Sequence, residues 1–168
     1  VAVTLVPTCI PPAGWEATCE AIGVRTVRIG GPEELRRVDG LAGSVVVSFC
    51  NGQFLAHAAV FRELGCRIAW AGCMTFLFNM EMAHYREHGP FDAYVFQSEY
   101  QQRTLQPMLT EFGVGTERCF RIPGAFDAGE FPFRPRSHRG GEPFVIGRLS
   151  RVDRHKWPDH TWEIWKNI

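Results

Sequence analysis

Short apolar runs alternate with amphipathic stretches along most of the chain. The runs are rich in Val and Ile and nearly continuous in hydrophobicity, as is typical of strands buried on both faces of a parallel sheet. They predict strands at residues 1–6, 24–29, 44–49, 67–72, 93–97, 119–122 and 143–147. Because helical patterns separate these strands, the sequence predicts an α/β fold with a Rossmann-like, doubly wound, mostly parallel sheet.

The segments 14–22, 53–65 and 99–113 have the apolar spacing of helices that cover a sheet. The last of them begins with a capping box, in which Ser98 is the N-cap residue and Gln101 follows three positions later. The faces expected to be buried in the second and third helices consist of Phe54, Ala58, Phe61 and Leu64, and of Leu105, Met108, Leu109 and Phe112.

The alternation stops after residue 122, where a stretch rich in Pro and Gly predicts a linker. We therefore divide the chain into a Rossmann-like first domain at 1–125, a linker at 126–142 and the beginning of a second domain at 143–168. The last part is too short to enclose a core of its own.

The overall charge argues against nucleic acid as a partner. The chain has 18 Lys and Arg against 18 Asp and Glu, whereas general nucleic-acid binding depends on neutralising many phosphates. The cations are concentrated, however. Residues 118–156 hold nine Arg or Lys and four Asp or Glu, and nine minus four leaves a local charge of +5. Such a region suits a compact anion such as a diphosphate, although a solvated basic surface is the simpler interpretation for any one residue.

The six cysteines predict neither a metal site nor a disulfide framework. None forms a CxxC motif, and no Cys and His set has zinc-binding spacing. Several lie in apolar runs, where a free thiol behaves as a small core residue. We therefore expect reduced thiols and a cytoplasmic location. No apolar run is long enough for a transmembrane segment, and no signal peptide is visible.

The stretch VIGRLSRVDRHKWP, residues 145–158, carries the most distinctive chemistry. No GxGxxG follows the first strand and no Walker A motif is present, so NAD, FAD or ATP sites of those types are not expected. Arg148 follows a predicted strand, at the edge where open α/β sheets bind ligands, and Lys156 precedes a predicted helix. The planar guanidinium of Arg and the ammonium charge of Lys can together hold a diphosphate. If that diphosphate is a leaving group, they hold it most strongly in the transition state, where negative charge grows on its departing oxygen.

Three segments occur in an order that carries a family resemblance. The first segment, YVFQSEYQQRTL, resembles a strand followed by Ser-Glu and a helix near the end of a first domain. The second, RIPGAFDAGEFPFRPR, resembles an interdomain turn. The third, FVIGRLSR…DRHKWP, resembles the start of a second domain. In this order they resemble glycosyltransferases of the GT-B fold, family four (group 1). The resemblance covers residues 93–158, and residues 1–92 fit only in their alternation of strands and helices.

The resemblance implies two Rossmann-like domains, the first binding an acceptor and the second a nucleotide-sugar donor. Arg148 and Lys156 would hold the donor diphosphate and stabilise the departing nucleoside diphosphate, with Arg151 and Arg154 as rivals for the second cation. The resemblance implies no metal and no cofactor besides the nucleotide-sugar substrate. The family's paired glutamates would come after Ile168, so we expect this chain by itself to be inactive.

The acceptor implied by the resemblance is a sugar, lipid or protein of unknown identity. Asn51, Glu81 and His84 are the candidates for acceptor contacts, with an ordinary polar surface role as the alternative for each. His84 is expected to reach solvent. The Met- and Phe-rich segment 73–85 could line a pocket for a lipid or aromatic group, but we expect it to be core.

Two other functions fit parts of the sequence. One is a non-catalytic, Rossmann-like binding module for a small anionic ligand or a protein partner. The other is a flavodoxin-like or response-regulator-like domain, which needs an acidic cluster or phosphate loop at the ends of the first strands. VAVTLVPTC offers no acidic residue there, so this second alternative is disfavoured.

Overall fold

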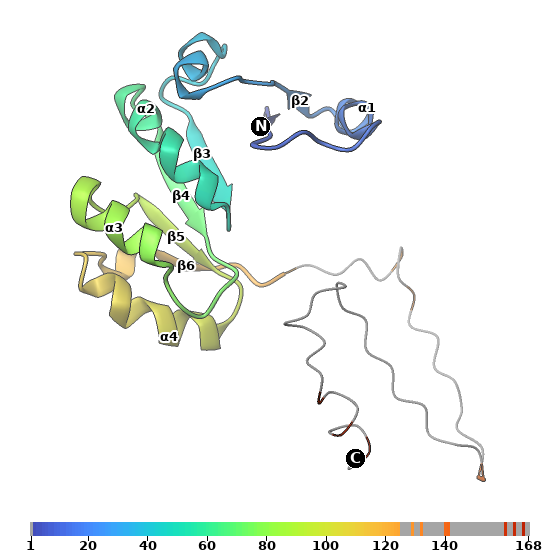
Figure 1. Cartoon of the computed structure of the whole chain (residues 1–168), viewed down its shortest axis with the longest axis vertical. Coiled ribbons are helices and arrows are strands. Elements are labelled where there is room, and N and C mark those ends of the chain that lie inside the picture. The colour runs from blue at the N-terminus through green and yellow to red at the C-terminus, as the bar shows by residue number, and fades with distance from the viewer. Residues whose placement is uncertain are drawn as a thin grey trace. The chain divides into compact units, whose positions relative to one another are not determined.

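The computed structural model describes residues 2–124 and the single residues 129, 132, 140, 141, 160, 163 and 166. The chain divides into two compact units, Val1–Ala125 and Phe126–Ile168, and all the helices and strands discussed below belong to the first (Figure 1). The predicted strand at 143–147 and the cations Arg148, Arg151, Arg154 and Lys156 lie outside the described residues. The proposed boundaries of the linker and the second domain stay predictions.

The first unit is an α/β structure whose strands are all parallel and form two sheets. A two-stranded sheet contains β1 (Thr4–Leu5) and β2 (Arg25–Thr26). A four-stranded sheet contains β3 (Val45–Phe49), β4 (Arg67–Ala71), β5 (Ala93–Phe96) and β6 (Cys119–Arg121), in that order. Each of these strands falls within a predicted apolar run, so the strand predictions up to residue 122 are confirmed.

The predicted helices are present as well. They are α1 (Trp15–Ala21), the 3₁₀ helix η2 (Gly52–His57) continued by α2 (Ala58–Glu63), and α4 (Glu99–Thr110). Ser98 caps α4, since its hydroxyl accepts a hydrogen bond from the Gln101 backbone N–H at 3.1 Å. The structure adds η1 (Pro32–Arg37), α3 (Asn79–His88) and η3 (Thr116–Arg118). Periodicity missed α3 because its buried residues are Glu81, His84 and Tyr85 rather than an aliphatic stripe.

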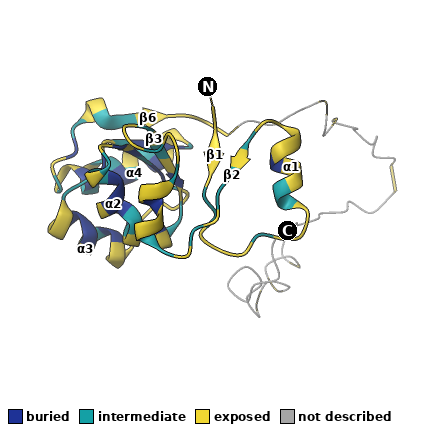
Figure 2. Ribbon diagram, turned by 90° about the horizontal axis from the view of Figure 1, so that it is seen from above, coloured by how far each residue is buried: buried dark blue, intermediate teal, exposed yellow. Residues whose placement is uncertain are grey.

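Within residues 2–124, helices cover only one face of the four-stranded sheet. The strand order β3-β4-β5-β6 follows the order of the chain, and the crossover between each pair of parallel strands has the same hand. The connecting helices α2, α3 and α4 therefore lie on the same face of the sheet (Figure 1). Ile68, Trp70 and Tyr94 are buried in the core cluster that also contains residues of these helices, whereas Val45 and Val47 of β3 are exposed. Figure 2 shows buried residues, in dark blue, in and around α2, α3 and α4. The architecture is compatible with a Rossmann-like fold, but it differs from the single doubly wound sheet that the sequence predicted. The strands β1 and β2 pair with each other and form a sheet of their own.

The core lies between the covered face and the helices. It contains the predicted faces of η2–α2 and α4, so those faces are confirmed. At its centre are aromatic rings from η2, β4, α3 and the turn before β5. Within the described part of the chain, no helix has the length and apolar character needed to cross a bilayer.

Candidate functional site: the carboxyl edge of the sheets

The carboxyl ends of parallel strands meet at one edge of a sheet, which is where open α/β sheets bind ligands. At this edge the loop 72–78, between β4 and α3, is fixed by two glutamines from the segment after β5. Gln97 Nε2 donates to the Gly72 carbonyl at 3.1 Å, and Gln101 Nε2 donates to the Met74 carbonyl at 2.8 Å. Gln101 is itself buried. The loop is therefore held in one position against the ends of the strands.

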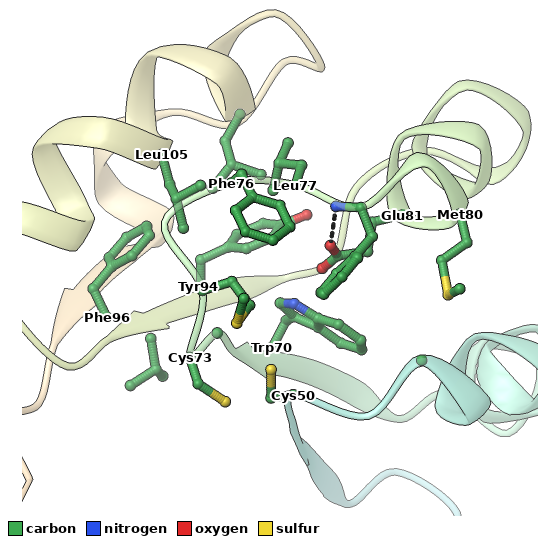
Figure 3. Close-up of a pocket in the computed structure, with 16 residues that line it drawn as sticks. Cys50, Trp70, Cys73, Phe76, Leu77, Met80, Glu81, Tyr94, Phe96 and Leu105 are labelled. Carbon is green, nitrogen blue, oxygen red and sulfur yellow. Dashed lines mark hydrogen bonds between the residues drawn. The ribbon is translucent and has the colours of Figure 1, made fainter. Parts of the chain in front are cut away.

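A small cavity, the strand-end pocket, opens beneath this loop (Figure 3). Its volume is about 40 Å³, enough for only a few atoms. Its lining is largely apolar and includes Cys50, Trp70, Cys73, Phe76, Leu77, Met80, Tyr94 and Phe96, with Glu81 as the one carboxylate among the lining residues. Small-molecule sites typically have volumes of roughly 300–1,000 Å³, so this pocket as it stands is too small for most ligands.

The rim of the strand-end pocket is exposed and apolar. Met74, Phe76, Phe78 and Met80 are all exposed, and the rings of Phe76 and Phe78 make an edge-to-face contact at 5.1 Å. Only Leu77 of this stretch turns inward and is buried. The expectation that this Met- and Phe-rich segment is core is therefore wrong for these four residues, because a loop can bury few of its side chains while its backbone follows the sheet edge.

Glu81 is a buried carboxylate at the wall of this pocket. Its side chain accepts a hydrogen bond from the Phe78 backbone N–H at 2.7 Å, as a Glu in the first turn of a helix can do. Burial raises the pKa of Glu81, and hydrogen bonds from the Phe78 backbone and the Trp70 side chain oppose that rise. The charged form of Glu81 is therefore less favourable in the folded protein than in the unfolded chain.

We expect this carboxylate to make stability depend on pH. Its folded pKa is raised, so its contribution to the free energy of unfolding is complete below the ordinary Glu pKa and declines as pH rises through the raised value. Glu81→Gln keeps an acceptor for the Phe78 N–H but has no proton to lose. Denaturant unfolding across this pH range should therefore show a smaller decline for Glu81→Gln than for the parent.

The control for this prediction is Glu87→Gln, on the exposed side of the same helix. That variant should retain the decline of the parent chain. An unchanged slope in Glu81→Gln would show that Glu81 ionises alike in the folded and unfolded states.

A larger hollow, the loop crevice, lies where the segments after β1 and β2 meet η2. Its volume is about 500 Å³, and it is lined by Pro7, Thr8, Cys9, Arg28, Gly30, Gln53 and His57, among others. The polar groups in it are a hydroxyl, a guanidinium, an amide and an imidazole. Arg28 is paired with Glu16 at 2.7 Å, which fixes its direction. This size and mixture of groups are typical of a site for a small polar ligand.

Asn51 lies beside the loop crevice and contacts two of its lining residues. Its Nδ2 donates to the Thr8 hydroxyl at 2.7 Å, and its Oδ1 accepts from the Gln53 backbone N–H at 3.0 Å. It thereby ties the segment after β1 to the segment after β3. Asn51 is thus at the predicted edge, but its side chain holds the wall of the crevice together.

His84 lies elsewhere. It is 8 % exposed and packs against Phe91 at 5.2 Å, so the expectation that it reaches solvent is wrong. Its Nε2 is buried and has no hydrogen-bond partner among the residues that the structure describes. Burial lowers the pKa of His84, and the charges of Arg62 and His88 lower it further. The three acceptor candidates therefore divide between the crevice wall, the strand-end pocket and the core.

Thr8, Arg28 and Gln53 are the crevice residues that sequence reasoning did not select. Each follows a strand within a few positions, and this placement at strand ends was the available signal. None of the three belongs to a sequence motif, so no pattern identified any one of them as a site residue. Among the residues that the structure describes, no group of three or more His, Cys, Asp or Glu side chains is arranged to hold a metal ion.

Comparisons of the chain with protein-family models, with curated proteins and with solved structures gave no match, so the chain is assigned to no family.

Proposed function

We propose that this chain carries the acceptor-side domain of a GT-B glycosyltransferase, which transfers a sugar from a nucleotide-sugar donor. One observation supports the proposal above the others. The resemblance in residues 94–105 concerns a strand followed by Ser-Glu and a helix, and here β5 ends at Phe96, Ser98 caps the next helix and Glu99 begins it. The parallel α/β architecture is of the general kind that the proposal needs.

In this proposal the acceptor binds in the loop crevice. The Thr8 hydroxyl, the Gln53 amide and the His57 imidazole can exchange hydrogen bonds with the hydroxyl groups of a sugar-like acceptor. His57 is half-buried and its Nδ1 lies 3.1 Å from the Gln53 carbonyl oxygen, which orients the ring. Asn51 positions the wall, and Glu81 remains a candidate for contact from the strand-end pocket.

Arg148 and Lys156 supply the donor-side chemistry in this proposal, with Arg151 as the rival of Lys156. Their positive charges would hold the diphosphate of the donor. As the bond to the sugar breaks, negative charge grows on the departing oxygen, and cations placed beside it stabilise that state more than the bound substrate. The transfer as proposed uses no metal, and the free state of all six cysteines suits a cytoplasmic enzyme.

The proposal predicts that the chain binds nucleoside diphosphates through these cations. We expect calorimetric titration to detect binding of UDP or GDP, and both Arg148→Ala and Lys156→Ala to weaken it by about tenfold or more, since a hydrogen bond to a charged group contributes about 1.5–3 kcal/mol. Arg103→Ala removes an exposed cation of α4 and should leave the affinity unchanged.

A binding module for a small anionic ligand is the second candidate, because Arg28 brings a guanidinium into the loop crevice. In that case anion binding should weaken in Arg28→Ala and be indifferent to Arg148→Ala and Lys156→Ala. Such a result would overturn the donor-site proposal in favour of the module.

A further inference from the structure

Two cysteines stand at the carboxyl ends of adjacent strands. Cys50 directly follows β3, and Cys73 follows β4 after Gly72. These strands are paired in parallel, with Phe49 opposite Ala71, and the Cys50 backbone N–H donates to the Ala71 carbonyl at 2.8 Å. The two backbones are therefore still hydrogen-bonded neighbours at the point where the cysteines occur.

The backbone at Cys50 has an unusual conformation. Its φ angle is 47°, and among the residues that the structure describes it is the only one other than glycine with positive φ. A side chain in this left-handed region costs roughly 1–2 kcal/mol, and such strained residues concentrate at functional sites. The chain turns sharply here, and Asn51 after the turn is tied to Thr8. The direction of the Cys50 side chain is thus set by structure on both sides of it.

Cys50 and Cys73 both line the strand-end pocket, and their side chains lie near one another in Figure 3. Burial, a hydrogen bond with Cys50 and the charge of Cys50 together raise the pKa of the Cys73 thiol to about 11. Cys73 is exposed and Cys50 is half-buried, so a small reagent can reach the pair from the rim.

The other four cysteines are placed differently. Cys19 and Cys66 are buried, and the Cys66 thiol donates to the Leu41 carbonyl at 3.1 Å. The Cys119 thiol donates to the Gly115 carbonyl at 3.7 Å. Cys9 is exposed and lines the loop crevice, and Cys119 is half-buried, as Cys50 is. Cys50 and Cys73 are therefore distinguished by being both accessible and adjacent.

We propose that Cys50 and Cys73 form a dithiol site that closes to a disulfide by exchange with a small-molecule disulfide such as oxidised glutathione. The Cys50 thiolate attacks one sulfur of the small disulfide, which forms a mixed disulfide on Cys50 and releases one thiolate. The Cys73 sulfur, after losing its proton to solvent, then attacks the Cys50 sulfur and displaces the second thiolate. In sum, two protein thiols are oxidised and one small disulfide is reduced to two thiols.

The strand register places the two cysteines close to one another. A disulfide joins Cα atoms about 4.4–6.8 Å apart, and adjacent strands lie about 4.8 Å apart. Cys50 comes one residue after the paired Phe49, and Cys73 comes two residues after its partner Ala71, so the cysteines are diagonal neighbours across the pair. Closure would link β3 to the loop 72–78 and so fix the rim of the strand-end pocket. This inference does not depend on glycosyl transfer.

The test uses the whole chain, reduced and then incubated with oxidised glutathione without denaturant. Free thiols are blocked with N-ethylmaleimide, and the protein is digested with trypsin and mapped by mass spectrometry. Cleavage after Arg37, Arg62, Arg67 and Arg86 separates Cys50, Cys66 and Cys73 into different peptides. We expect the peptides 38–62 and 68–86 to be joined, and to be two hydrogen atoms lighter than the sum of their reduced masses.

Three variants sharpen the result. Cys50→Ser and Cys73→Ser should each abolish the joined peptides and leave at most a mixed disulfide on the remaining thiol. Cys9→Ser, the matched control, should form the bridge as the parent does. Circular dichroism checks that each variant is folded. As a measurement without substitution, phenylarsine oxide, which binds paired thiols, should block bridge formation in the parent chain.

Other outcomes would overturn the proposal. Separate glutathione adducts on Cys50 and Cys73, with no joined peptides, would show that the thiols act singly. A bridge between Cys9 and Cys50 would assign the exchange to the loop crevice instead. Failure of oxidised glutathione to modify either residue would show that the pair is closed to such reagents.

Discussion

Replacing Phe91 by Ala is expected to lower the free energy of unfolding by about 3–5 kcal/mol, because a large aromatic side chain is removed from a packed core and leaves a cavity. Phe91 is 1 % exposed. Its ring stacks on Trp70 at 5.4 Å and makes edge contacts with Phe54 at 5.9 Å and Tyr85 at 5.6 Å. It therefore joins β4, η2 and α3, and its loss loosens all three.

Urea unfolding followed by circular dichroism measures this change. Domains are typically stable by only about 5–15 kcal/mol, so Phe91→Ala should be unfolded at a much lower urea concentration than the parent. Phe76→Ala is the matched control, because Phe76 is an exposed rim residue, and its effect should stay within about 0.5 kcal/mol. Equal effects of the two substitutions would contradict the assignment of Phe91 to the centre of the core.

Replacing Arg62 by Ala is expected to destabilise the protein by about 2–3 kcal/mol. The guanidinium of Arg62, on α2, donates to the carbonyls of His88 and Gly89, the latter at 2.9 Å, and to that of Pro90 at 3.1 Å. It thereby caps the C-terminus of α3, whose last carbonyls have no partner within the helix. It also lies over the Phe91 ring, 5.6 Å from its centroid.

Thermal and urea unfolding of Arg62→Ala and Arg62→Lys show how much of the stabilisation comes from the positive charge and how much from the planar guanidinium. The Lys variant keeps the positive charge but has no planar fork, so it should recover only part of the loss. Arg67→Ala is the control, because Arg67 is a largely exposed surface residue whose ion pair with Asp92, at 3.5 Å, contributes little. A full recovery in Arg62→Lys would mean that charge alone supports this end of α3.

These two residues also bear on the candidate site. Phe91 and Arg62 secure the C-terminal half of α3, and Glu81 lies in the first turn of the same helix at the strand-end pocket. A looser α3 would therefore move Glu81 and the rim of the pocket. Stability and site geometry are coupled through this one helix.

Local patterns in the sequence were sufficient to predict most of the helices and strands. Nearly continuous apolar runs predicted each strand up to residue 122, and capping chemistry predicted the start of α4 at Ser98. These signals succeed because they depend on residues that are close together in the chain. The same signals failed for α3, where the buried face contains Glu81 and His84.

Local sequence patterns were not sufficient to predict which residues line the candidate site. Asn51 was selected because it stands just past a predicted strand, and both Asn51 and Glu81 lie at the carboxyl edge. Thr8, Arg28 and Gln53 were not selected, since they are far apart in the sequence and only the meeting of their loops makes a crevice. The diphosphate-binding role of Arg148 and Lys156 stays a prediction from sequence.

The sequence by itself thus determined the α/β alternation, the caps and the apolar helix faces, because each is a property of a short segment. Only the tertiary structure decided that β1 and β2 form a separate sheet, that Met74 and Phe76 are exposed, and that Cys50 and Cys73 line the same pocket. The physical reason is that pairing, burial and a shared pocket are relations between segments, and parallel strands bring together residues that no local period connects.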